Sequence, residues 1–181
     1  MKLKIVLMLI LFLLILSGCS EFEVDKFSED DMCIINTDVS GEVCYGMSRS
    51  DAEKVLGFGT KNDLGWFDYD NGVIVQYRDN LVASVSLTNK SKDVYTTSRG
   101  TGIKMLKEEV KELYGDKYDI EEGEQSLDYV YDLNDEKFLD KLSRDTSEVM
   151  KMRFRIHVGF DINGYSISIS LGDALMLDSL Y

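Results

Sequence analysis

The sequence predicts an α+β fold built from two tandem units, each a short helix followed by an antiparallel meander of strands. Residues 46–57 and 104–115 carry apolar side chains at helical intervals and both end on glycine, which is typical of short helices with a glycine C-cap. Residues 81–87 and 165–171 alternate apolar with small polar side chains, which is typical of strands buried on one face. We therefore expect the helices to pack on the apolar face of two small sheets or of one continuous sheet.

The first unit is expected over residues 33–99. Its helix should be capped by Ser48, whose hydroxyl can accept a hydrogen bond from a backbone N–H in the first turn. Asn-Gly and Asp-Asn pairs separate the strands that follow, and both pairs tolerate tight hairpins. The predicted strands are residues 64–70, 73–77 and 81–87.

The second unit is expected over residues 100–181. An insertion at about residues 134–148 interrupts it, and the helical spacing of Phe138, Leu139 and Leu142 predicts one extra short helix there. The predicted strands of this unit are residues 127–133, 149–160 and 165–171.

Residues 1–18 have the layout of a secretory signal, with a basic start, an apolar run over residues 5–16 and two small residues. That run is too short for a helix that crosses a bilayer, which needs about twenty apolar residues. The sequence Leu-Ser-Gly-Cys at 16–19 matches the lipobox of bacterial lipoproteins. We therefore expect cleavage before Cys19 and anchoring by lipid, such as palmitate, at a bacterial membrane facing outside the cytoplasm. The alternative is an ordinary signal followed by a chance cysteine.

The mature chain is expected to be strongly acidic. Removing residues 1–18 removes two lysines and no acids, so the formal net charge falls from −13 to −15. Such a chain repels nucleic acid, whose binding depends on Lys and Arg, so a nucleic-acid partner is not expected. Residues 19–32, the lipidated cysteine and the acid-rich segment after it, are expected to form a solvated tether.

Two further cysteines, Cys33 and Cys44, lie in the exported part. A disulfide between them is expected, because exported proteins meet oxidising conditions. The weaker alternative is a metal site, but no second pair of Cys or His lies nearby. We expect no metal and no cofactor.

A family resemblance is carried by residues 97–115, TSRGTGIKMLKEEVKELYG, and by the repeat over residues 45–171. The chain resembles the tandem-repeat modules of β-lactamase inhibitory protein and the small lipoproteins of the SmpA/OmlA outer-membrane assembly type. The resemblance implies a fold that grips other proteins through a sheet surface, and it implies no catalytic residues. The chain departs from the pattern at 104–106, where Lys-Met-Leu replaces the usual Gly, Asp and Ser or Thr. We therefore expect the second helix to begin earlier, with Thr101 as its cap.

One strand suggests a binding surface, because its charged side chains share one face. The row consists of Lys151, Arg153, Arg155 and His157. One interpretation is a solvated face paired with carboxylates of neighbouring strands. The other is a positive stripe that orients an acidic ligand in an otherwise acidic domain. Trp66 is a second candidate, as either a core residue or an exposed interface anchor.

No catalytic residues are predicted. The chain has one histidine and no serine in a nucleophile elbow. The acidic stretch at 116–124 and the turn at 68–71 lack the spacing of a calcium loop and are expected to be surface turns. The leading hypothesis is a membrane-anchored, non-catalytic protein-binding or inhibitor-like module that recognises an envelope protein or another envelope component. The alternatives are a cell-wall glycan hydrolase with a carboxylate pair and a structural envelope-assembly factor.

Overall fold

The computed structural model describes residues 22–38 and 40–178. The predicted signal segment 1–18 and the predicted lipidation site Cys19 lie outside the described residues. Within the described part of the chain, no helix is long and apolar enough to cross a bilayer.

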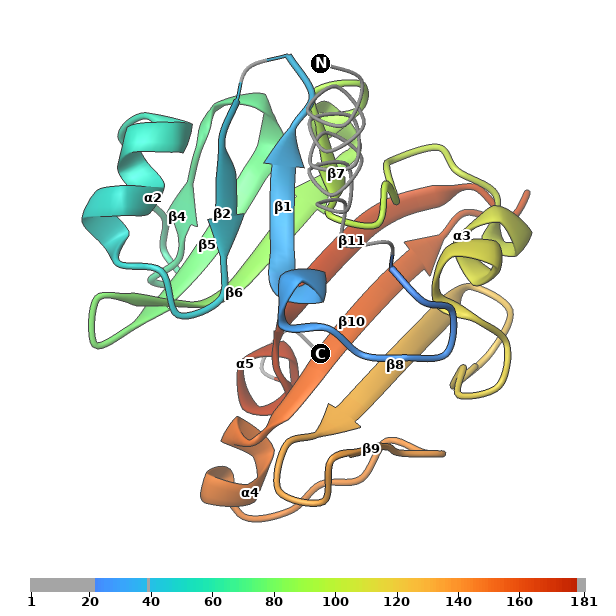
Figure 1. Cartoon of the computed structure of the whole chain (residues 1–181). Coiled ribbons are helices and arrows are strands. Elements are labelled where there is room, and N and C mark those ends of the chain that lie inside the picture. Colours follow the sequence, from blue (N-terminus) through green and yellow to red (C-terminus); the bar gives the residue numbers. More distant parts are fainter. Residues whose placement is uncertain (1–21, 39, 179–181) are drawn as a thin grey trace, which may run out of the picture.

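A large antiparallel sheet of eight strands, in the order β3-β4-β5-β6-β11-β10-β8-β9, forms the centre of the fold (Figure 1). The two strands with matching alternation, β6 and β11, lie side by side with Val85 opposite Leu171. One continuous sheet therefore forms, and with the helices the α+β class is confirmed. The strands are β3 (Thr60–Lys61), β4 (Phe67–Asp68), β5 (Val73–Arg78), β6 (Leu81–Thr88), β8 (Ser126–Asp132), β9 (Lys137–Phe138), β10 (Arg153–Phe160) and β11 (Ser166–Asp173).

A smaller sheet and two helices cover one face of the large sheet. In Figure 1 the small sheet, in the order β2-β1-β7, lies in front of the large one, between α2 and α3. Its strands are β1 (Cys33–Asn36), β2 (Glu42–Cys44) and β7 (Tyr95–Thr97), and the helices are α2 (Arg49–Leu56) and α3 (Lys107–Tyr114). The apolar core lies between these layers. It includes the fully buried residues Ile34, Val43, Ala52, Val73, Val85, Val110, Val158 and Leu171.

The two helices begin by different means. Ser48 caps α2 as expected, and its hydroxyl accepts a hydrogen bond from the backbone N–H of Asp51 at 3.2 Å. The expected early start of α3 is wrong, because Leu106 precedes its first turn and the Glu109 carboxylate accepts the Leu106 N–H at 2.7 Å. Thr101 is buried and its N–H donates to Thr97. The chain before α3 is instead held by bridges to β7 and to Tyr165.

The insertion folds differently from the prediction. Phe138 lies in β9, opposite Tyr131 of β8, and extends the sheet, whereas Leu139 and Leu142 lie in neither a helix nor a strand. The extra helix, α4 (Ser147–Lys151), comes later, and β10 therefore begins at Arg153 rather than at residue 149. A helix that was not expected, α5 (Ala174–Asp178), follows β11 directly. Three short 3-10 helices complete the described elements: η2 (Glu29–Met32), η3 (Asp70–Gly72) and η4 (Asn89–Ser91).

Residues 22–32 pack against the domain, so the expectation of a solvated tether is wrong for this part of the segment. The Phe27 ring stacks on Tyr131 with the ring centroids 4.3 Å apart. Asp31 and Met32 are buried. The segment carries apolar side chains among its acids, and Arg99 lies where it pairs with the buried Asp31. Together these contacts offset the cost of ordering the segment.

The two predicted units, 33–99 and 100–181, each contribute a helix and neighbouring antiparallel strands. Strands β4, β5 and β6 are consecutive neighbours after α2, and β8, β10 and β11 are neighbours after α3. That the two units are related repeats stays a prediction, because it rests on the similarity of the two sequences alone.

Candidate functional site

The site begins with a row of charged side chains on β10 that faces away from the core. Phe154, Ile156 and Val158 of this strand belong to the core side. Alternation therefore sends Arg153, Arg155 and His157 to the opposite face of the sheet. On the neighbouring strand β8, Asp132 is opposite Arg153 and Asp128 is opposite His157.

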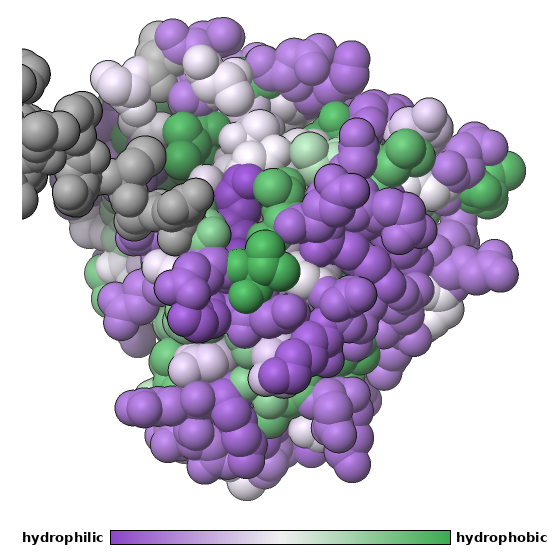
Figure 2. All heavy atoms as spheres, turned by 45° about the vertical axis from the view of Figure 1, so that its right-hand side comes forward, coloured by the Kyte–Doolittle hydropathy of each residue, from purple (hydrophilic) through white to green (hydrophobic). Residues whose placement is uncertain are grey.

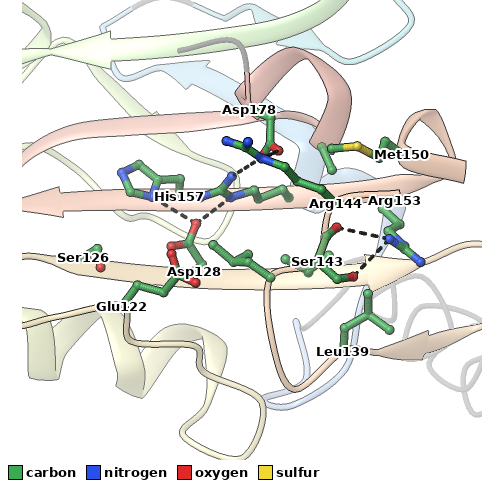
Figure 3. Close-up of a pocket in the computed structure, with 14 residues that line it drawn as sticks. Glu122, Ser126, Asp128, Leu139, Ser143, Arg144, Met150, Arg153, His157 and Asp178 are labelled. Carbon is green, nitrogen blue, oxygen red and sulfur yellow. Dashed lines mark hydrogen bonds and ion pairs between the residues drawn. The ribbon is translucent and has the colours of Figure 1, made fainter. Parts of the chain in front are cut away.

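Asp128 joins two members of this row (Figure 3). Its Oδ1 atom lies 2.7 Å from Nε of Arg155 and 2.9 Å from Nδ1 of His157. Nε of Arg153 donates to Oδ2 of Asp132 at 3.0 Å. Two aspartates of β8 therefore hold the side chains of β10 in fixed positions.

Two segments later in the chain place further charged side chains beside this row. Asp178, at the end of α5, accepts a hydrogen bond from Nη1 of Arg155 at 3.1 Å. Arg144, between β9 and α4, lies with its Nε 3.5 Å from Oδ2 of the same aspartate. Arg153 also contacts Asp145 at 3.3 Å. The charges on this face consequently alternate in sign and form two adjacent groups of ion pairs, one centred on Arg155 and one on Arg153, which together we call the network.

A pocket of about 420 Å³ lies over this network. The polar residues of Figure 3 line one part of it, and Val130, Leu139, Leu142, Met150 and Ala174 supply an apolar part. The remaining lining residues are Glu122, Ser126, Asp128, Ser143, Arg144, Arg153, Arg155, His157 and Asp178. A concave site with an apolar wall and a few fixed polar groups is the usual form of a binding pocket.

The two aspartates of β8 in the network have lowered pKa values. Burial by itself raises the pKa of Asp128, but the hydrogen bonds from His157 and Arg155 outweigh it, and the pKa is lowered overall. The same balance lowers the pKa of Asp132, where burial is opposed by Arg153 and by two backbone N–H groups. A glycosidase needs one carboxyl group with a raised pKa as its acid. Asp128 and Asp132 do not meet that requirement.

The predicted binding row is only partly assembled. Arg155 and His157 are 5% and 6% exposed, and the row is neutralised by carboxylates, so the expectation of an open positive stripe is wrong. Of the other interpretation, a solvated face paired with carboxylates, the structure shows the pairing for Arg153 and Arg155 but not the solvation, because Arg155 is buried. Lys151 lies in α4, where it pairs with Glu148, and does not line the pocket.

The other sequence candidates lie elsewhere. Trp66 is half-buried near the β3–β4 hairpin and does not line the pocket, and its backbone N–H donates to Asn62. A disulfide joins Cys33 to Cys44 across β1 and β2. Glu42 lies beside the two sulfur atoms, and within the described ranges no other cluster of this kind has the spacing of a metal site. Because both sulfurs are bonded to each other, we assign no metal to this group.

Sequence reasoning missed the five residues that complete these ion pairs: Asp128, Asp132, Arg144, Asp145 and Asp178. Asp128 could have been found, because it alternates with the core residues of β8 and therefore faces the same side as the row on β10. Arg144 and Asp178 carry no such signal, since only tertiary folding brings the loop before α4 and the end of α5 to this face.

Comparisons with known proteins add no relative. No protein-family model, no curated protein and no solved structure matches the chain. The function therefore has to be inferred from the site and the sequence.

Proposed function

We propose that the chain is a membrane-anchored extracytoplasmic lipoprotein whose folded domain is a non-catalytic binding module, with the pocket over β8 and β10 binding a segment of an envelope protein. The observation that carries the proposal is the pocket itself, with an apolar wall beside a rigid charged network. The lipobox-like sequence at 16–19 supports the proposed attachment to a membrane.

The pocket offers two kinds of contact to a protein segment. Leu139, Leu142 and Met150 provide an apolar wall for an apolar side chain. The side chain of Arg144 is 85% exposed and stands at the rim, where its guanidinium can pair with a carboxylate of the partner. Aromatic or aliphatic anchors and arginine pairs are the contacts that dominate protein interfaces.

The network beneath the pocket favours binding because it is preorganised. Arg155 is fixed by both Asp128 and Asp178, so its side chain loses little freedom when a partner arrives. The lowered pKa of Asp128 also makes this carboxyl group unsuited to be the protonated acid that glycoside hydrolysis uses. Both features support binding rather than catalysis.

The pocket is tested by capture from envelope extracts with the lipid-free domain, residues 20–181. The variant Arg144→Glu reverses a charge at the rim of the pocket. The side chain there is exposed and contributes little to the stability of the fold. We expect it to lose the protein that the unaltered domain retains. Lys90→Glu is the matched control, because Lys90 is exposed, lies in η4 and does not line the pocket. Equal capture by all three proteins, or no capture by any, would contradict the proposal.

The proposed acylation of Cys19 is tested separately. The variant Cys19→Ser should not incorporate palmitate in growing cells, and it should leave the membrane fraction. Labelling of Cys19→Ser equal to that of the parent would show that Cys19 is not the acylated residue.

A further inference from the structure

A buried arginine holds the N-terminal segment on the domain. Nε and Nη2 of Arg99 donate to the two carboxylate oxygens of Asp31 at 2.6 and 2.9 Å. The same guanidinium donates to the backbone oxygens of Glu23, Lys26 and Leu113 at 3.1, 2.5 and 2.9 Å. Both charged side chains are 2% exposed. A bidentate, buried, charge-assisted cluster of this kind does not open without leaving an unpaired charge inside the protein.

Further contacts fix the segment upstream of Asp31. The backbone N–H of Asp25 donates to the Tyr114 carbonyl at 3.0 Å. The Asp25 carboxylate accepts the backbone N–H of Lys117 at 3.2 Å. The Phe27 ring stacks on Tyr131. We name residues 22–32 the strap, because they are bound along their length to the end of α3 and to β8.

The strap and the pocket lie on opposite faces of the same strand. The strap contacts Tyr131, which lies on the same face of β8 as the core residues Leu127 and Tyr129. The pocket is lined by Asp128 and Val130, whose side chains point the other way. The large sheet therefore separates the strap from the pocket.

Chain length limits how far the strap can lie from a lipid on Cys19. Three residue steps separate Cys19 from Phe22, the first described residue. Whatever path they follow, they reach at most about 10 Å, because an extended chain spans roughly 3.3–3.6 Å per residue. An acylated cysteine lies at the bilayer surface. The start of the strap must then lie at that surface too.

We propose that the strap fixes the orientation of the anchored domain, with the end of α3 facing the lipid headgroups and the pocket opening away from the membrane. This inference rests on the proposed lipidation of Cys19. The strap and the end of α3 expose Glu23, Val24, Lys26, Asp116 and Lys117, so this surface carries charges of both signs, and Lys26 pairs with Glu23. The domain is thereby presented to partners that lie further from the bilayer.

The orientation is tested with the full mature lipoprotein in vesicles of phosphatidylethanolamine and phosphatidylglycerol. A fluorophore is placed on a single new cysteine, either Lys117→Cys beside the strap or Ser147→Cys at the start of α4, and both positions are exposed. The vesicles carry a headgroup quencher. We expect severalfold stronger quenching at position 117 than at position 147.

A linker variant shows whether the strap causes the difference. A Gly/Ser insertion of about fifteen residues between Glu21 and Phe22 adds roughly 20 Å of mean reach and leaves every strap contact in place. We expect it to remove most of the difference between the two positions. Equal quenching at both positions in the unaltered protein would overturn the orientation. So would a difference that persists undiminished with the linker.

The two proposals fail in distinguishable ways. A mature chain that does not sediment with the vesicles contradicts the lipid anchor, and the orientation fails with it. A chain that sediments but shows equal quenching contradicts the orientation alone.

Discussion

Asp128 is the residue on which the pocket network depends most. One of its oxygen atoms serves both Arg155 and His157, and its side chain is 1% exposed. Removing one partner of a buried ion pair leaves the other charge uncompensated. The pocket floor therefore depends on this single carboxylate for its stability.

We predict that Asp128→Asn lowers the free energy of unfolding by about 3 kcal/mol, the usual cost of breaking a buried pair from one side. Urea unfolding of the domain would measure it. Asp135→Asn is the control, because the Asp135–Lys137 pair is exposed and such pairs contribute about 0–1 kcal/mol. Equal losses in the two variants would show that burial of Asp128 is not what matters.

The lowered pKa of Asp128 and Asp132 predicts an acid-sensitive fold. A carboxyl whose pKa is lower in the folded state contributes stability above its unfolded pKa of about 3.9, and that stability is lost as the pH falls toward the folded pKa. We expect stability to drop between about pH 5 and pH 3. The slope in this window should be smaller in Asp128→Asn. An unchanged slope in urea titrations at each pH would contradict the assignment.

At the scale of elements, the junction between α3 and the strap depends on one glycine. Gly115 has a φ of 103°, and a Cβ atom there would lie 2.0 Å from Oδ1 of Asp25. A side chain at residue 115 would therefore force Asp25 of the strap to shift.

We predict that Gly115→Ala destabilises the domain by about 1–3 kcal/mol more than Gly123→Ala, because overpacking adds to the strain of positive φ. Gly123 is the matched control, since its φ is 108° and a Cβ atom added there would meet no atom within 4 Å. Thermal and urea unfolding would give both values. Limited proteolysis should also cut the strap faster in Gly115→Ala. Equal losses would show that contact with Asp25 is not limiting.

Local patterns predicted the central elements well and the peripheral ones poorly. The alternation in β6 and β11 fixes which face of each strand is buried, and this signal lies within a few residues. The spacing of Phe138, Leu139 and Leu142 suggested a helix, but cross-strand pairing with β8 decided the outcome for Phe138. The strap was missed because Asp31 and Arg99 are 68 residues apart in the sequence. Only part of the pocket could be predicted, for the same reason. Arg153, Arg155 and His157 lie on one strand, whereas Arg144 and Asp178 come from segments that only tertiary folding brings to this face.

At the scale of the whole molecule, the excess of negative charge affects the stability of the fold. Hydrophilic residues dominate the face shown in Figure 2, and its hydrophobic residues form small separate groups. The formal net charge of −13, which becomes −15 in the proposed mature chain, produces repulsion within the folded state. The strap nevertheless holds several acids against the domain, where Arg99 compensates only one of them directly.

We predict that the free energy of unfolding rises as sodium chloride is raised from about 10 to 150 mM, because the screening length shortens from about 30 to 8 Å. Urea unfolding at each concentration would measure the trend. Choline chloride at the same ionic strength should give the same rise if screening is the cause. A fall in stability would show that the surface ion pairs outweigh the general repulsion.

For the exported, acylated chain that we propose, the contact between Arg99 and Asp31 also sets an order of events during export. A polypeptide that crosses the membrane from its N-terminus delivers residues 22–32 first, yet their binding partners at 99 and 113–117 emerge much later. The acylated end is thus free of the domain while the early part of the chain collapses, and it docks only when the chain through α3 has arrived. Under that proposal, attachment to the lipid and closure of the fold are separate steps, because Cys19 crosses the membrane before the residues that hold the strap in place.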